Sequence, residues 1–246
     1  MRAPEPLPLV LAHRGDHTRS RENTTAAFGA AHLAGADGVE LDVRRSADGI
    51  LLVHHDATAD GVGVLGHATF GQVRDVLPWL PTLDEALDAC ARMHLVNVEI
   101  KNIPTDPDFD ESEGIVDAVV DLAARRRSDP GPRMVISSFM VPSLERVKGL
   151  DATIETAWLT FPDLEPRAAL RAAAERGIGG VHPARQALER SDVPGVVDHA
   201  RDLGLALRPW TVNDAGDLRR FLAAGVDAVI TDRPADAVAL RNEEPQ

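Results

Sequence analysis

Several features that anchor or cross-link other proteins are scarce in this 246-residue chain. Its one cysteine, Cys90, cannot form an internal disulfide, so the fold does not depend on an oxidising compartment. No apolar run approaches the ~20 residues that span a bilayer. The N-terminal apolar stretch 7–12 is too short, and too interrupted by proline, for a signal peptide. We therefore expect a cytoplasmic protein without stable membrane insertion.

Basic residues and tyrosine are also in short supply. The chain has 26 lysines and arginines against 39 acidic residues, which gives a formal net charge of −13. A chain this acidic is a poor partner for nucleic acid, whose phosphates are held by general positive charge. An anionic substrate would have to meet a local arginine, lysine or metal ion instead. Because tyrosine is absent, no tyrosine can donate a proton or line a substrate site.

Short apolar runs alternate with longer amphipathic runs along the whole sequence. The strand-like runs are 9–12, 38–43, 96–100, 134–137, 154–158, 179–182, 206–210 and 228–231. The helix-like runs are 23–34, 82–93, 114–126, 141–149, 164–176, 192–203, 214–224 and 234–240. Eight strand–helix repeats without a linker predict an α/β fold, a TIM (β/α)8 barrel, over a single domain of residues 1–246.

Local signals support several of the predicted helices. Thr82 and Glu85 have the spacing of a capping box, and Asn213 or Asp214 can cap the helix that follows. Cys90 falls on the apolar side of the helix-like run 82–93. We expect it to be a small buried hydrophobic residue.

One strand-like run, 50–55, is left over. It follows 38–46 across Asp48-Gly49, a strong signal for a two-residue hairpin turn, so we expect an antiparallel extension beside the second barrel strand. With that turn, Asp42 pairs with His55, and the two side chains share a face. A slip of one residue would put His54 there instead. Only a short insertion, 57–81, separates this hairpin from the next barrel helix.

Strand alternation separates apolar from charged residues on the second and third strands. Glu40 and Asp42 point to one face of 38–43, and Glu99 and Lys101 to the matching face of 96–100. The apolar residues between them suit the interface with helices, so the charged ones face the barrel interior near the C-terminal ends of the strands. His13 and Arg14 end the first strand at the same rim.

Three inward carboxylates repel one another unless positive charge lies between them. Oxygen ligands in this number suit a hard divalent cation, Mg²⁺ or Ca²⁺. The alternative is an ion-pair network in which Arg14, Arg44 and Lys101 neutralise the carboxylates. His13 and His55 beside such a cluster suggest an acid/base pair. The sequence gives His182 a structural role and assigns none to the remaining exposed or loop histidines, which are His17, His32, His67, His94 and His199.

An ordered set of short motifs spans residues 13 to 234. Together they resemble the glycerophosphodiester phosphodiesterase family, within the superfamily of phospholipase-C-like phosphodiesterase TIM barrels. The segments that carry the resemblance are His13-Arg14-Gly15, Glu22-Asn23-Thr24, Glu40-Leu41-Asp42-Val43, His55-Asp56, Glu99-Ile100-Lys101, Trp210-Thr211-Val212-Asn213 and Thr231-Asp232-Arg233-Pro234.

The resemblance implies metal-dependent hydrolysis of glycerophosphodiesters to glycerol 3-phosphate and an alcohol, with one divalent cation, Mg²⁺ or Ca²⁺. It implies that His13 and His55 are the general acid and base, without saying which is which. The remaining implied roles are metal ligation by Glu40, Asp42 and Glu99, phosphate binding by Arg14 and Lys101, and a substrate-side wall formed by Trp210.

The sequence departs from the family pattern at three places. The proline and the arginine that often follow His-Asp in the family are absent from Ala57-Thr58-Ala59-Asp60-Gly61, so a contact with the phosphate or headgroup is expected to be missing. Asp16 replaces the usual small residue after His-Arg-Gly, and the segment 57–81 is shorter than in many relatives, which suggests an open site. An open, apolar mouth would favour an alternative, a lysophospholipase-D-like or cyclising phosphodiesterase that acts on lysophospholipids. A barrel that binds phosphorylated ligands without cleaving them is a second alternative. The sequence does not determine the oligomeric state.

Overall fold

The computed structural model describes residues 7–128 and 131–243 of the chain. Within them, eight parallel strands lie side by side in the order β10-β9-β8-β7-β6-β2-β1-β11. Backbone hydrogen bonds from Asp227 N to Leu207 O and from Ile230 N to Pro209 O, both 3.0 Å long, bridge the remaining edge. The strands are β1 (Leu9–His13), β2 (Gly38–Arg45), β6 (Leu95–Ile100), β7 (Arg133–Ser138), β8 (Glu155–Thr160), β9 (Gly180–Pro183), β10 (Ala206–Leu207) and β11 (Ala228–Thr231).

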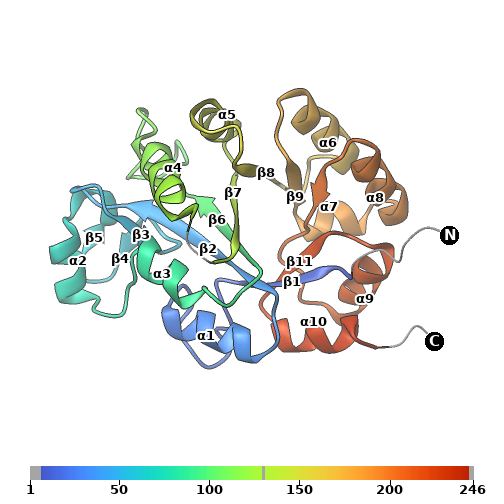
Figure 1. Cartoon of the computed structure of the whole chain (residues 1–246), viewed down its shortest axis with the longest axis horizontal. Helices are drawn as coiled ribbons and strands as arrows, with labels where there is room; N and C mark the ends of the chain where they lie inside the picture. The colour runs from blue at the N-terminus through green and yellow to red at the C-terminus, as the bar shows by residue number, and fades with distance from the viewer. Residues whose placement is uncertain (1–6, 129–130, 244–246) are drawn as a thin grey trace.

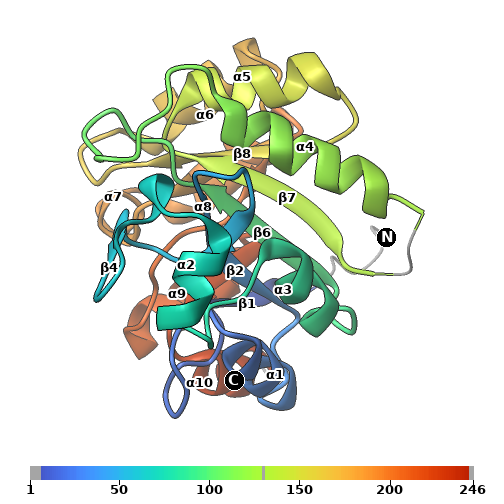
Figure 2. The same ribbon diagram turned by 90° about the vertical axis from the view of Figure 1, so that its left-hand side faces the viewer.

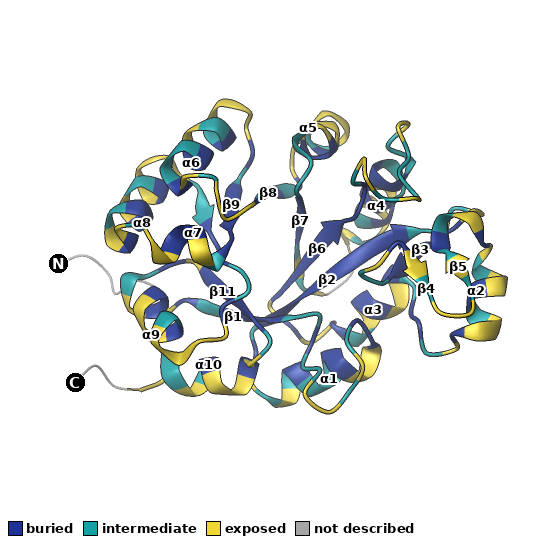
Figure 3. Ribbon diagram, turned by 180° about the vertical axis from the view of Figure 1, so that it is seen from behind, coloured by how far each residue is buried: buried dark blue, intermediate teal, exposed yellow. Residues whose placement is uncertain are grey.

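Helices surround this sheet and expose only their outer faces (Figures 1 and 3). They are α1 (Thr25–Leu33), α3 (Leu83–Ala89), α4 (Gly114–Arg126), α5 (Val141–Leu150), α6 (Pro166–Glu175), α8 (Val193–Asp202), α9 (Ala215–Ala224) and α10 (Pro234–Arg241). A short helix, α7 (Arg185–Glu189), precedes α8 and was not expected from the sequence. The strand–helix alternation predicted from the sequence is confirmed as a TIM barrel.

The two faces of β2 and β6 divide as the alternation predicted. Val39, Leu41 and Val43 are buried together with helix residues such as Leu83 and Ile115. Their counterparts on β6 are Val96, Val98 and Ile100, which belong to the same core. Burial of these side chains at roughly 25 cal/mol per Å² holds the helices against the outside of the barrel. The charged residues between them are thereby turned to the inside.

The helix starts also follow the local signals. Thr82 and Glu85 form the predicted capping box at α3, and the Asp214 side chain accepts hydrogen bonds from the first turn of α9. α3 ends at Ala89 rather than at residue 93. Cys90 lies directly after it, free and fully buried, as expected.

The hairpin after β2 is present, but its predicted register was wrong by one residue. β3 (Leu51–Val53) runs antiparallel to β2, with Arg44 opposite Leu52, so the ladder directs His54 toward Asp42. The reason is the turn, which has three residues, closed by a hydrogen bond from Ser46 N to Ile50 O. Gly49 takes the left-handed conformation that such a loop requires, with φ +87°.

The segment between β3 and α3 is folded rather than a simple connection. It contains β4 (Thr58–Ala59), β5 (Gly63–Val64), a 3-10 turn η1 (Leu65–His67) and α2 (Phe70–Val76). Figure 2 shows this group at one side of the barrel, next to β2. Leu65, Val73 and Leu80 form a small core of their own around Leu52 of β3. The segment therefore anchors the hairpin that leads to His55.

Candidate active site

A cavity of about 140 Å³ lies at the C-terminal ends of the barrel strands. Its wall consists of His13, Arg14, Glu40, His55, Glu99, Lys101, Phe139, Leu159, Trp210 and Ile230. Seven of the eight residues predicted from the sequence are among these lining residues. The eighth, Asp42, is fully buried behind Arg14 and Lys101.

Glu40, Asp42 and Glu99 each direct one carboxylate oxygen to a common point. The three oxygens lie within 4.8 Å of one another, and the relative exposures of the residues are 3%, 0% and 7%. Their closeness follows from the sheet, since Asp42 and Glu99 are register partners on β2 and β6 and Glu40 is two residues before Asp42 on the same face. The structure therefore brings the three predicted ligands together.

Two cations flank the carboxylates without neutralising all of them. Arg14 Nε lies 3.2 Å from one oxygen of Asp42, and Lys101 Nζ lies 3.0 Å from the other and 2.5 Å from Glu99 Oε1. These cations hold the pKa of Asp42 well below its usual range despite its burial. Burial, reinforced by the charge of Asp42, raises the pKa of Glu40 to about 8.

The residues at this point fit a divalent cation. Glu40 Oε1 is buried without a hydrogen-bond partner. The three carboxylates face two permanent cations, Arg14 and Lys101, besides His13, whose charge depends on its protonation. The third cation of the alternative ion-pair network, Arg44, is directed elsewhere: it binds Asp108 at 2.7 Å and Asp106 at 2.9 Å. An ion with a preference for oxygen ligands would satisfy the free oxygen and balance the remaining charge.

His13 is oriented by the carboxylate of Asp232, a residue to which the sequence had assigned no role. Its Nδ1 donates to Asp232 Oδ1 over 2.6 Å, and its Nε2 lies 3.9 Å from Glu40 Oε2. Burial opposes the charged imidazolium, but Asp232 and Glu40 outweigh this effect and raise the pKa of His13. Asn213 Nδ2 in turn donates to Asp232 over 2.6 Å. The sequence signals for Asp232 were its position directly after the last barrel strand and its place in the segment Thr231-Asp232-Arg233-Pro234.

His55 reaches the cavity although it is not part of the β2–β3 ladder. The ladder ends at Val53, and the chain then bends, so that the ring lines the cavity while Arg44 Nε holds the His55 carbonyl at 2.8 Å. Its Nδ1 donates to Asp56 Oδ1 over 2.7 Å. Burial lowers the pKa of His55 more than the nearby Asp42 carboxylate raises it, and Lys101 and Arg14 lower it further. The position expected for His55 was right, but the register argument for it was not.

The loop after β1 adopts an unusual backbone to place Arg14. Arg14 has φ +56°, its N–H donates to Glu40 O over 2.8 Å, and Gly15 follows with φ +83°. A Cβ on Gly15 would lie 2.8 Å from Ala27, so no larger residue fits there. Asn23 Nδ2 donates to Asp42 Oδ2 over 2.8 Å and, buried beside the loop, ties it to β2. Left-handed backbone at a non-glycine residue is often found where a site demands it.

Aromatic rings form the apolar side of the cavity. Trp210 lies edge-on to Phe139 with ring centroids 5.4 Å apart, and its Nε1 donates to His182 O over 2.8 Å. Phe161 stacks on Phe139 at 4.6 Å and is 57% exposed. We call Trp210, Phe139 and Phe161 the aromatic platform. It extends from the cavity to the surface.

The structure shows how two of the departures from the family pattern lie relative to the cavity. The Asp16 carboxylate accepts hydrogen bonds from the backbone and hydroxyl groups of Thr18, at 3.1 and 2.7 Å, and does not belong to the carboxylate cluster. None of the residues that line the cavity comes from the segment 57–81. The wall of the cavity is therefore formed by the barrel strands and by other loops.

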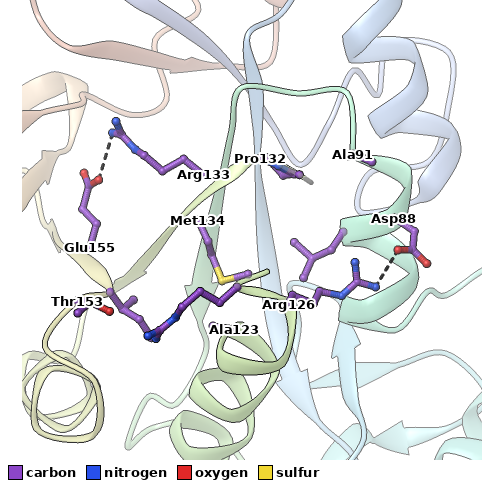
Figure 4. A pocket seen from close by; sticks show the side chains of 13 residues that line it. Asp88, Ala91, Ala123, Arg126, Pro132, Arg133, Met134, Thr153 and Glu155 are labelled. Atoms are coloured by element: carbon purple, nitrogen blue, oxygen red, sulfur yellow. Dashed lines mark hydrogen bonds and ion pairs between the residues drawn. The ribbon is translucent and has the colours of Figure 1, made fainter. Parts of the chain in front are cut away.

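A larger cavity, of about 680 Å³, lies where β7 and β8 begin, at the other end of the barrel (Figure 4). Its arginines are paired with carboxylates: Arg126 lies 2.8 Å from Asp88, and Arg133 lies 3.1 Å from Glu155. The described residues that line it include no histidine. In TIM barrels, residues at this end serve stability rather than chemistry.

Known proteins share both the sequence and the fold of this chain. The model of the glycerophosphoryl diester phosphodiesterase family matches residues 13–236. A glycerophosphodiester phosphodiesterase from Caldanaerobacter subterraneus subsp. tengcongensis is 34% identical and covers 94% of this chain and 97% of its own length. A second one, from Bacillus subtilis, is 29% identical over 92% of this chain and 84% of its own length.

Solved structures agree with this assignment. The glycerophosphodiester phosphodiesterase from Thermotoga maritima has a TM-score of 0.80 and 26% identity, and the match covers 96% of this chain and all of that one. An Oleispira antarctica phosphodiesterase, solved with its product sn-glycerol-3-phosphate, has the same fold with a TM-score of 0.80 and 24% identity over 96% of this chain and 98% of its own. The chain belongs to the glycerophosphoryl diester phosphodiesterase family and is a phosphodiesterase.

Proposed function

We propose that this enzyme hydrolyses glycerophosphodiesters to glycerol 3-phosphate and an alcohol with the help of one divalent cation. The observation that carries the proposal is the convergence of three carboxylates, two cations and two histidines on one small cavity. Its 140 Å³ is below the ~300–1,000 Å³ of ordinary ligand sites. Only a small part of a substrate, such as a phosphate with its glycerol, would be enclosed.

The metal-binding residues in this proposal are Glu40, Asp42 and Glu99, whose oxygen donors suit Mg²⁺ or Ca²⁺. A bound cation supplies positive charge that offsets the charge developing on the phosphate oxygens. Arg14 and Lys101 contribute the same kind of stabilisation from the protein and hold the phosphate in position. Both side chains line the cavity and lie beside Asp42, so they are placed to act together with the ion.

The two histidines move the protons. As a nucleophilic oxygen, from water or from the substrate's own glycerol hydroxyl, forms its bond to phosphorus, one imidazole accepts its proton. The bond from phosphorus to the alcohol oxygen breaks, and the other imidazole protonates that oxygen. When the glycerol hydroxyl is the nucleophile, this step gives a cyclic phosphate. Water then attacks its phosphorus and loses a proton, and the bond to the glycerol hydroxyl oxygen breaks as that oxygen is protonated, which leaves glycerol 3-phosphate. We assign proton acceptance to His55, whose lowered pKa keeps it neutral, and donation to His13, whose pKa is raised.

The proposal is tested by incubating the purified protein with glycerophosphodiesters that carry different alcohols and measuring the release of glycerol 3-phosphate. A phosphate monoester serves as the control substrate. We expect glycerol 3-phosphate from the diesters and no reaction with the monoester. Binding of the diesters without any product would instead support the non-catalytic alternative.

Replacing Asp232 by asparagine is expected to shift the alkaline limb of the kcat/KM profile to lower pH, because Asp232 raises the pKa of His13, which must be protonated to donate. Its counterpart is Asp56→Asn. Asp56 raises the pKa of His55, which must be neutral to accept, so this variant should shift the acid limb to lower pH. pH profiles of both variants at saturating metal test the assignment. A shift of the acid limb by Asp232→Asn would reverse the two roles.

Lysophospholipids are a second candidate class of substrate, supported by the aromatic platform. Phe161 is 57% exposed beside a cavity that is too small for an acyl chain. Exposed apolar surface at the mouth of a site is typical of a contact with apolar ligand groups. In this version of the reaction, the same phosphorus is attacked, and the acylated glycerol lies over Phe139 and Phe161.

Phe161→Ala separates the two substrate classes. If the platform binds acyl chains, kcat/KM for lysophosphatidylcholine should fall by about tenfold, as expected for the loss of ~1.5 kcal/mol of apolar burial. Turnover of glycerophosphocholine should stay within about twofold. Leu150→Ala, a change at a similarly exposed residue (51%) on α5, should affect neither substrate. Equal effects of Phe161→Ala on both substrates would exclude the acyl role.

A further inference from the structure

A second group of potential metal ligands lies on the opposite side of His13 from the carboxylate cluster. One ligand atom each from His13, His17 and Asp232 lies within 4.8 Å of the others. β1 and β11 are hydrogen-bonded neighbours, so His13 at the end of β1 meets Asp232 just after β11. His17 approaches from the loop after β1, and its Nε2 donates to Asp232 Oδ1 over 3.2 Å.

The spacing of these atoms is close to that of a tetrahedral ion site. Bonds of about 2.0–2.1 Å around zinc place neighbouring ligand atoms about 3.3 Å apart. The separation of His17 Nε2 and Asp232 Oδ1, 3.2 Å, already matches. The hydrogen bond from His13 Nδ1 to the same oxygen, 2.6 Å, would have to lengthen by about 0.7 Å after the proton leaves. Asn213 holds the other oxygen of Asp232, so Oδ1 remains for an ion.

The chemistry of the donors distinguishes this group from the carboxylate cluster. Two imidazole nitrogens and one carboxylate oxygen suit zinc and related transition ions, whereas Mg²⁺ and Ca²⁺ prefer oxygen ligands alone. The three side chains are 18%, 28% and 31% exposed, so an ion from solution can reach them. Three protein ligands would also leave a fourth position for water.

We propose that His13, His17 and Asp232 form a separate site for a zinc-class ion and that its occupation inhibits the enzyme. An ion bound to His13 Nδ1 displaces the proton on that nitrogen. The hydrogen bond from His13 to Asp232, which orients the imidazole ring, is then lost. His17 has no function in the proposed reaction. Among the described residues, its side chain forms a hydrogen bond with Asp232 only. The inhibition rests on the proposed function, whereas the binding does not.

His17→Gln tests the proposal, because the glutamine amide can still donate to Asp232 but is a poor zinc ligand. The protein, saturated with Mg²⁺, is titrated with Co²⁺, which reports a tetrahedral site by visible absorption, and Zn²⁺ is then added in competition. The wild-type protein should bind one equivalent of Co²⁺ that Zn²⁺ displaces. In His17→Gln the affinity should fall by more than about tenfold, since even outer partners of a metal contribute about 10–100-fold. His67→Gln, at a histidine in η1, is the matched control and should bind like the wild type.

Turnover provides the second readout. Zn²⁺ should inhibit the wild type in the presence of excess Mg²⁺, and His17→Gln should keep its basal turnover and resist Zn²⁺. Equal inhibition of both proteins, or Co²⁺ binding that is unchanged in His17→Gln, would overturn the proposal, because the ion would then act at the carboxylate cluster or elsewhere. If the protein proved inactive on all diesters, the Co²⁺ titration would still decide whether the site exists.

Discussion

Replacement of His55 by alanine is expected to slow the turnover of glycerophosphodiesters by about 10²–10⁴-fold, the usual contribution of a positioned acid or base. His55 lines the same cavity as His13, and its Nδ1 is engaged by Asp56, which leaves Nε2 for proton transfer. The same loss is expected for His13→Ala. Because the proton is handled in the chemical step, the loss should lie mainly in kcat, measured by the release of glycerol 3-phosphate.

His54→Ala is the matched control for this experiment. His54 precedes His55 directly, but its Nδ1 is bound to the Asp56 carbonyl at 2.9 Å and its ring lies 6.4 Å from that of Trp79. It is not among the residues that line the cavity. We expect its turnover to stay within a few-fold of the wild type. An active His55→Ala enzyme together with an inactive His54→Ala enzyme would mean that the wrong histidine had been assigned.

Glu40→Gln is expected to reduce activity by about 10²-fold or more at limiting metal, because it removes the charge of one ligand from the carboxylate cluster. The fold should not suffer. In the absence of an ion, Glu40 stays protonated in the folded protein up to a pKa of about 8, whereas it ionises near pH 4.5 in the unfolded chain. The free energy of unfolding therefore decreases as the pH rises between these two values. The amide removes that decrease, so the metal-free variant should unfold at the same or a higher temperature than the wild type near pH 8.

In Glu40→Gln we therefore expect lower activity and weaker binding of the metal, but an unchanged or higher unfolding temperature of the metal-free protein. Excess Mg²⁺ should recover part of the activity if the loss comes from weaker binding of the ion. Asp16→Asn is the control. Among the described residues, the Asp16 carboxylate forms hydrogen bonds with Thr18 only, so this variant should keep its activity within a few-fold of the wild type. A Glu40→Gln enzyme with full activity at limiting metal would remove Glu40 from the ion.

The barrel and the carboxylate cluster could be predicted because both follow from short-range rules. Alternation along β2 places Glu40 and Asp42 on one face, and the parallel pairing of β2 with β6 brings Glu99 beside Asp42. Eight strand–helix repeats then leave little freedom in the topology. Capping at Thr82 and Asp214 is equally local.

The remainder of the site depends on distances that sequence spacing does not encode. Ala47 joins Asp48 and Gly49 in the turn, and this extra residue shifts the register of the hairpin by one. His55 reaches the cavity because the chain bends after Val53, not because the ladder places it there. Asp232 meets His13 only because the last strand closes against the first. Their partnership, 219 residues apart in the chain, has no local signal.

The long-range ion pairs of Arg44 were equally hidden. The sequence placed it near the carboxylates, as one of three cations that could neutralise them. In the structure it binds Asp106 and Asp108 and holds the carbonyl of His55. Its partners lie in the loop after β6, whose path depends on packing and not on strand periodicity. The carboxylate cluster therefore has only Arg14 and Lys101 as permanent cations.

The central claim is that Glu40, Asp42 and Glu99 share one divalent ion that hydrolysis requires. The most direct measurement is the release of glycerol 3-phosphate by protein dialysed against a chelator, before and after Mg²⁺ or Ca²⁺ is returned. The account predicts that release stops without the ion and resumes when about one equivalent per chain has bound. Turnover that is indifferent to chelation, in a protein shown to be free of metal, would contradict it.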